Sequence, residues 1–320
     1  ESLHKALLAT GQCRLDTRVA VIGASGSVGR LAAIHLAGYY ASLVLVGNSA
    51  NAQAIDQLGE IAGEIYAQAL HQMQRGSTVG LAQYLRVHLS EPMSVVAHCN
   101  QIVLRDEAPD YRAVRRIVES HLPCPAPIEV SVDIEQVIRN AHGVLSATSV
   151  GKSFIEPGWL KDAAVVCDAA RPPDLKASVR EERPDVLVFE GGVVKFVEPY
   201  KFGRANILCF DQSLNLACLS ETVALSMSGV KQSYSLGNRI PYEQAMRIFR
   251  LALSHGFADC IATTEGELDL QAMGFAEKNI ANLTPGARKP STAARCGAPT
   301  SPTTACCSTA CWRWPARRHA

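Results

Sequence analysis

Short apolar runs alternate with amphipathic stretches along the first two thirds of the chain. Residues 19–22 and 43–46 are continuously apolar, and residues 31–36 between them have a helical pattern. Further segments with the composition of strands occur at residues 128–132, 143–150, 163–167, 186–189 and 193–197, and those at 163–167 and 186–189 are continuously apolar. Short apolar runs separated by helical segments predict parallel strands joined by crossover helices. We therefore expect an α/β fold, a Rossmann-type doubly wound parallel sheet.

The interval between the second and third predicted strands is longer than a crossover requires. It spans about 80 residues, whereas a crossover needs about a dozen. Residues 52–74 and 111–121 have helical patterns, and residues 94–98 have the composition of an extra strand. We expect a helical insertion at about 52–121, whose role as a lid, a dimer contact or structural padding stays open.

The pattern becomes helical after residue 199. Residues 213–229 and 241–255 are predicted helices, and Gly229 and Gly256 are suited to end them. The expected organisation is an N-terminal segment at 1–17, a dinucleotide-binding domain at 18–200 and a C-terminal helical region at 201–285. Residues 286–320 lack any helical or strand period, so we expect a disordered or adventitious tail.

Composition and charge bear on which kinds of binding partner are expected. The 320 residues carry a formal net charge of +1 and are 48% hydrophobic, which gives no reason to expect nucleic acid or an anionic membrane. No apolar run is long enough for a transmembrane helix, and no signal peptide is expected. The 11 cysteines include no C-x-x-C pair. This scatter favours a reduced cytoplasmic protein without a metal site, and leaves a homo-oligomer open.

A glycine-rich turn follows the first predicted strand. Gly23, Gly26 and Gly29 lie between that strand and the helical pattern that follows it. Such a turn brings the backbone and a helix N-terminus to the pyrophosphate of a dinucleotide. The predicted cofactor contacts in this turn are Gly23, Ser25, Gly26, Ser27, Val28 and Gly29.

The end of the second strand bears on the choice of dinucleotide. An NAD site usually has Asp or Glu there, and an NADP site often has Arg nearby. This chain has neither, and Asn48 and Ser49 are instead predicted to contact the ribose. With no carboxylate to repel a 2′-phosphate, we expect NADPH, with NADH as the alternative.

The chain lacks the Tyr-x-x-x-Lys pair of short-chain dehydrogenases. The remaining candidate for a catalytic residue is a cysteine. Cys218 lies near the start of a predicted helix. If Asn215 caps that helix, the helix dipole stabilises the thiolate, but if Asp211 is the cap, Cys218 lies too deep. An inert thiol in the core is the alternative.

Five segments of the chain resemble the long-chain acyl-(acyl-carrier-protein) reductases, which reduce a fatty acyl thioester to an aldehyde. The segments are Gly23-Ala-Ser-Gly-Ser-Val-Gly29, Cys167-Asp-Ala-Ala-Arg-Pro-Pro-Asp-Leu175, Phe189-Glu-Gly-Gly-Val-Val194, Ala217-Cys-Leu-Ser-Glu-Thr-Val-Ala-Leu225 and Ser254-His-Gly-Phe257. The resemblance implies that Cys218 carries the acyl group as a thioester. It also implies that acyl carrier protein or acyl-coenzyme A is the substrate.

Strand ends supply the remaining candidates for the site. Ser146, Ala147 and Thr148 end the strand expected beside the nicotinamide, and Gly191 and Gly192 follow a later strand. These residues are expected to line the cofactor site or to stabilise an oxyanion. His255 ends a predicted helix and is either a catalytic acid or a structural cation.

Two other functions fit the same pattern. The segment Ser146-Ala-Thr-Ser149 is suggestive of shikimate or glutamyl-tRNA reductases, which are also built on Rossmann domains. A non-enzymatic dinucleotide-binding module is the third interpretation.

Overall fold

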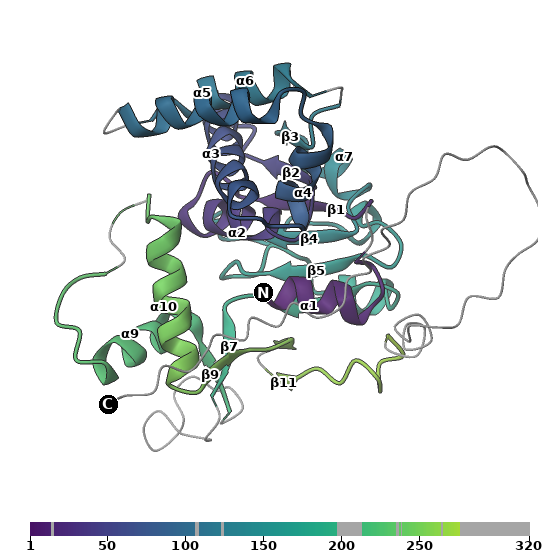
Figure 1. The fold of residues 1–320 in the computed structure, drawn as a ribbon. Coiled ribbons are helices and arrows are strands. Elements are labelled where there is room, and N and C mark those ends of the chain that lie inside the picture. Colours follow the sequence, from purple (N-terminus) through teal and green to yellow (C-terminus); the bar gives the residue numbers. More distant parts are fainter. Residues whose placement is uncertain are drawn as a thin grey trace, which may run out of the picture. The chain divides into compact units, whose positions relative to one another are not determined.

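The largest sheet in the described residues has six strands, all parallel (Figure 1). The computed structural model describes residues 1–13, 16–105, 109–122, 125–196, 213–234, 237, 239–263 and 265–275. The strands are β1 (Arg18–Ile22), β2 (Ser42–Val46), β3 (Ile128–Ser131), β4 (Gly143–Ser146), β5 (Val165–Asp168) and β6 (Leu187–Glu190). Their order is β3-β2-β1-β4-β5-β6, and all pairs are parallel. The predicted Rossmann-type α/β fold is confirmed.

Helices cover both faces of this sheet. Alternate strand residues belong to two separate buried clusters, with Val19 and Leu43 in one and Ala20 and Val44 in the other. The first cluster packs under α1 (Ser2–Ala9) and α2 (Ser27–Ala37), and the second under α7 (Ile134–Ile138), η1 (Pro157–Trp159) and α8 (Val179–Glu182). Burial on both faces explains why successive residues of β1, β2 and β5 are apolar rather than alternating with polar ones.

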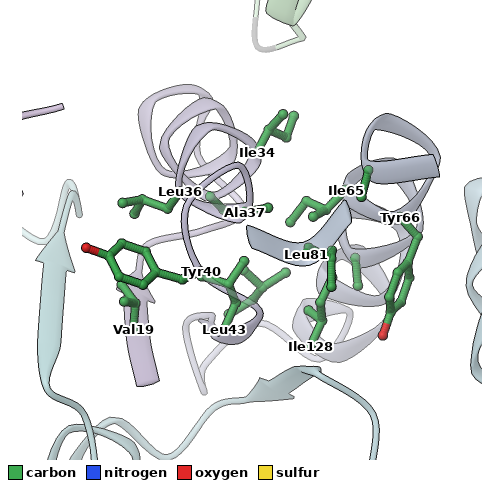
Figure 2. Packing of buried hydrophobic residues seen from close by; sticks show 14 of the residues in the cluster. Val19, Ile34, Leu36, Ala37, Tyr40, Leu43, Ile65, Tyr66, Leu81 and Ile128 are labelled. Carbon is green, nitrogen blue, oxygen red and sulfur yellow. The ribbon is translucent and has the colours of Figure 1, made fainter. Parts of the chain in front are cut away.

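The long interval between β2 and β3 is helical, as predicted. It contains α3 (Ala54–Gln74), α4 (Gly80–His88), α5 (Pro92–Arg105) and α6 (Tyr111–Ser120). Figure 2 shows how Ile34 of α2 and Leu43 of β2 pack with Ile65, Tyr66 and Leu81, which belong to α3 and α4. The insertion therefore extends the core of the sheet.

The extra strand expected at 94–98 is wrong, because these residues form part of α5. Val95, Val96 and Cys99 are buried and share one face of the helix. Two adjacent valines have the local appearance of a strand, but the spacing of three and four residues to Cys99 is helical.

The C-terminal region, expected to be helical, contains two helices and also short strands among its described residues. β7 (Val193–Phe196) pairs antiparallel with β8 (Leu214–Leu216) and β9 (Phe257–Asp259). The remaining elements are α9 (Ala217–Met227), α10 (Tyr242–Ser254), β10 (Ala262–Thr263) and β11 (Gly266–Glu267). The predicted helix at 213–229 therefore begins four residues late, because 214–216 pair with β7.

Two further expectations concern the C-terminal tail and membrane-spanning helices. The tail predicted at 286–320 lies outside the described residues. Within the described ranges, no helix combines the length and the apolar composition needed to cross a bilayer.

The contact between α3 and α6 gives a test of the packing. A Cβ atom on Gly63 would lie 1.7 Å from the backbone oxygen of Tyr111. We expect Gly63→Ala to lower the free energy of unfolding by about 2 to 3 kcal/mol, because backbone cannot move aside as a side chain can. Urea denaturation measures this.

The matched control is Gly158→Ala, because a Cβ atom there would meet no atom within 4 Å. Its unfolding free energy should change by less than about 0.5 kcal/mol. Equal stability of the two variants would contradict the described packing of α3 on α6.

Candidate functional site

The turn between β1 and α2 has a backbone that only glycine accommodates. Gly23 has φ +77°, and a Cβ atom there would lie 2.5 Å from the backbone oxygen of Ala147. The N–H group of Gly23 donates to the oxygen of Val46 at 3.0 Å. This turn is thus held between the carboxyl ends of β2 and β4.

The first turn of α2 rests directly on this loop. A Cβ atom on Gly29 would lie 2.2 Å from the oxygen of Gly23, so α2 approaches the loop closely. α2 begins at Ser27, as predicted, and its N-cap is Gly26, which provides no side-chain cap. Ser25, Gly26 and Val28 are exposed. The start of α2 therefore offers backbone N–H groups, which lack intrahelical acceptors, to a ligand.

The strand order places this loop at the switch point of the sheet. β1 lies between β2 and β4, so the chain crosses to opposite sides of the sheet from this point. Ligands of open parallel sheets bind at the carboxyl edge at such a point. The predicted cofactor residues after β1, β2, β4 and β6 all lie at this edge.

The end of β2 is polar and uncharged. Asn48 and Ser49 are exposed, and the side-chain oxygen of Asn48 accepts the N–H of Ala50 at 2.9 Å. This local bond leaves the amide NH₂ of Asn48 and the hydroxyl of Ser49 as donors toward the carboxyl edge.

The end of β4 is held by a buried carboxylate that sequence reasoning did not single out. Ser146 and Thr148 each donate a hydroxyl hydrogen bond of 2.6 Å to Asp174, and Asp174 is fully buried. The hydroxyls of Ser146 and Thr148 are therefore engaged within the protein. Ala147, between them, packs against Gly23.

A second carboxylate ends β5. Asp168 accepts the N–H groups of Ala170 and Leu175, both at 3.0 Å, and so caps the loop that carries Asp174. Burial raises the pKa of Asp168, and the charge of Asp174 raises it further.

A hydrogen bond joins the turn after β6 to the helix that carries Cys218. A Cβ atom on Gly191 would lie 2.7 Å from that of Ala169, and Gly192 has φ +71°. The N–H of Ala217 donates to the oxygen of Gly192 at 2.8 Å. The start of α9 is thus fixed next to the carboxyl edge of the sheet.

Cys218 is the second residue of α9 and is exposed. The N-cap of α9 is Leu216 rather than Asn215, and the alternative cap, Asp211, lies outside the described residues. Asn215 is buried and donates to the hydroxyl of Ser220 at 2.9 Å. Cys218 borders a hollow of ≈ 610 Å³, formed by α9 and residues 229–234. Cys218 is thus an exposed thiol in the first turn of α9.

The buried cysteines provide a contrast. Burial raises the pKa of the Cys167 thiol to about 12 and the pKa of the Cys99 and Cys260 thiols to about 11. At neutral pH these groups stay protonated, and the thiolate is the nucleophilic form. Among the cysteines that the structure describes, Cys218 is the one with the exposure that a nucleophile needs.

His255 lies at the opposite end of α9 from Cys218. It follows α10 as its C-cap, and its Nε2 atom is 2.7 Å from the hydroxyl of Ser228. Ser228 caps the C-terminus of α9, and ten residues of helix correspond to about 15 Å. The structure does not bring His255 to the Cys218 sulfur.

Comparison with known proteins finds a partial similarity to a curated protein. No protein-family model matches the chain. Aminotransferase PigE of Serratia sp. (strain ATCC 39006) is 30% identical over 141 residues, which are 43% of this chain and 16% of that protein. The chain thus matches less than a fifth of the length of this curated relative. Within the described ranges, no group of three His, Cys, Asp or Glu residues is arranged to hold a metal ion.

Proposed function

We propose that this chain binds NADPH, or alternatively NADH, and reduces a fatty acyl thioester to an aldehyde through Cys218. The observation that carries the proposal is the hydrogen bond from Ala217 to Gly192. It places an exposed cysteine on a helix start that adjoins the carboxyl edge of the parallel sheet.

The turn that contains Gly23, Gly26 and Gly29, the glycine cradle, is suited to hold a dinucleotide. Gly23 and Gly29 lie where any side chain would collide with backbone, whereas Gly26 faces an exposed part of the loop. The residues present therefore fit the close backbone approach that a pyrophosphate needs. The amide of Asn48 and the hydroxyl of Ser49 are suited to donate to a ribose or to its 2′-phosphate.

Cys218 would act as the acyl acceptor. Its thiolate attacks the carbonyl carbon of the carrier thioester, the bond from that carbon to the carrier sulfur breaks, and the carrier leaves as a thiolate that takes a proton from water. The bound dinucleotide would supply the hydride that reduces this acyl group. The tetrahedral adduct then expels the Cys218 thiolate and releases the aldehyde. Backbone N–H groups of the first turn of α9 after Ala217, whose own N–H is bonded to Gly192, would donate to the oxyanion.

The carrier is acyl carrier protein or coenzyme A, as the resemblance of the five sequence segments implies. Both present the acyl group as a thioester, and exchange between two thiols changes the bond energy little. The hollow beside Cys218 contains Leu225, Val230 and Tyr234, which are suited to contact an apolar chain.

The similarity to an aminotransferase suggests a catalytic protein but does not favour transamination here. The matched residues form 16% of that protein, so the activity in its name can reside in the remainder. An aminotransferase needs a lysine that forms a Schiff base with its pyridoxal cofactor. The glycine cradle at a switch point instead favours a dinucleotide.

The first prediction tests dinucleotide binding. Gly26 has φ −78° and ψ 161°, a conformation that valine readily adopts, and its Cβ atom would lie 3.3 Å from the oxygen of Gly23. We expect Gly26→Val to fold but to lose at least about tenfold in affinity for NADPH, because the side chain occupies the place of the phosphates. Titration of NADPH fluorescence measures this.

Gly158→Ala provides the matched control and should keep the affinity of the unmodified protein. If Gly26→Val binds NADPH and NADH as the unmodified protein does, the cradle is not the dinucleotide site.

The second prediction tests the acyl-enzyme. After incubation with a long-chain acyl-coenzyme A, mass spectrometry should find the acyl group on the peptide that contains Cys218. Cys218→Ser should keep NADPH affinity but lose aldehyde formation by about 10³-fold or more, because a serine hydroxyl is a far weaker nucleophile at neutral pH.

Cys13→Ser serves as the control, since Cys13 is partly exposed and lies on another part of the chain. It should keep both the acyl adduct and turnover. Turnover by Cys218→Ala would instead favour a Rossmann dehydrogenase without a covalent intermediate. Dinucleotide binding without any turnover would favour a non-enzymatic module.

A further inference from the structure

Asp174 is a buried carboxylate at the carboxyl edge of the sheet. It accepts the hydroxyls of Ser146 and Thr148 at 2.6 Å each, and the N–H of Thr148 at 3.3 Å. These three donors come from the exit of β4, whereas Asp174 lies in the loop after β5. All three bonds are directed toward the Asp174 oxygens, so the side chain of Asp174 acts as an acceptor in each of them.

The groups described around Asp174 include another carboxylate and neutral donors, but no cationic side chain paired with it. The neighbouring carboxylate of Asp168 is occupied by the N–H groups of Ala170 and Leu175. Arg171, in the same loop, forms its ion pair with Glu190. In the part of the chain that the structure describes, no lysine or arginine pairs with Asp174 or Asp168. The negative charge at this position is therefore not neutralised by a nearby ion pair.

The exit of β4 forms part of the candidate dinucleotide site. Ala147 lies between the two residues that Asp174 holds, and its oxygen is the atom that a Cβ on Gly23 would strike. In a doubly wound sheet the two mononucleotide halves bind on either side of the switch point. With the ribose-recognising positions after β2, the nicotinamide half falls on the side of β4, β5 and β6.

We propose that Asp174 sets the relative affinity of this site for oxidised and reduced dinucleotide. The inference rests on the proposed dinucleotide site. The nicotinamide ring carries a positive charge only in its oxidised form, and a carboxylate buried in a medium of low dielectric attracts that charge. The same attraction favours hydride donation to the acyl carbon, because the ring becomes positive as the hydride leaves with its electron pair.

The test compares the dissociation constants of NADP⁺ and NADPH in the full chain, measured by calorimetry. Asp174→Asn keeps the volume and lets Ser146 and Thr148 retain partners, but removes the charge. We expect the affinity for NADP⁺ to fall by about threefold to tenfold relative to that for NADPH. A purely structural role would weaken both ligands equally.

Asp185→Asn is the matched control. Asp185 precedes β6 at the opposite edge of the sheet, and hydrogen bonding to Arg183 lowers its pKa to about 2, so the substitution also removes one charge. It should leave the ratio of the two constants unchanged. If Asp174→Asn fails to fold, Asp174→Ser removes the same charge and keeps a hydroxyl.

The outcomes separate this inference from the proposed function. A changed ratio in Asp174→Asn alone supports the role of Asp174. An unchanged ratio, or an equal loss for both ligands, overturns it while the dinucleotide site stands. If the unmodified protein binds neither NADP⁺ nor NADPH, the dinucleotide site itself is wrong, and this inference with it.

Discussion

The close approach of three backbone segments at the switch point constrains the rest of the site. The turn after β1 contacts the backbone of Ala147 on one side and the first turn of α2 on the other. Gly23 and Gly29 permit this, since a Cβ atom at either position would lie 2.5 Å or less from a backbone oxygen. With the turn fixed, the start of α2 and the exit of β4 are fixed as well. The carboxyl edge thus acquires its shape from backbone rather than from side chains.

Much of the fold follows from the sequence because burial on both sheet faces leaves a strong local signal. The central strands are largely apolar, and the predicted strands at 128–132, 163–167 and 186–189 overlap β3, β5 and β6. The errors occur where local pattern and tertiary pairing compete. Residues 94–98 resemble a strand but pack as a helix, and Leu214–Leu216 resemble a helix but pair with β7. In 94–98 the helical spacing to Cys99 outweighs the two adjacent valines, whereas the pairing of Leu214–Leu216 with β7 leaves no local signal.

The candidate site likewise has parts that the local sequence predicts and parts that only tertiary contacts determine. The glycine turn is a local feature, so its spacing in the sequence is sufficient to place it. Asp174 gains its position from residues 26 and 28 positions earlier, and the start of α9 from Gly192. Such contacts leave no periodic signal. The distance between Cys218 and His255 along α9 likewise depends on how α10 packs against α9, which the sequence does not reveal.

Charged contacts connect the dinucleotide helix to the part of the chain that carries Cys218. Arg30, in the second turn of α2, is buried and pairs with Glu64 of α3 at 2.5 Å, and it also donates to the oxygen of Ile240. Arg239 pairs with Glu60 at 2.6 Å. Residues 239–240 lead into α10, and α10 packs against α9.

These contacts give the insertion a structural purpose that its length alone does not suggest. Glu60 and Glu64 lie one turn apart on α3, and each holds an arginine from a different part of the chain. The pair with Arg30 is largely buried, so loss of either partner would leave an uncompensated charge at the root of α2. The exposed fraction of Arg239 is larger, so its pair contributes less. α3 therefore acts as the common support on which the dinucleotide helix and the segment leading to α10 are both fixed.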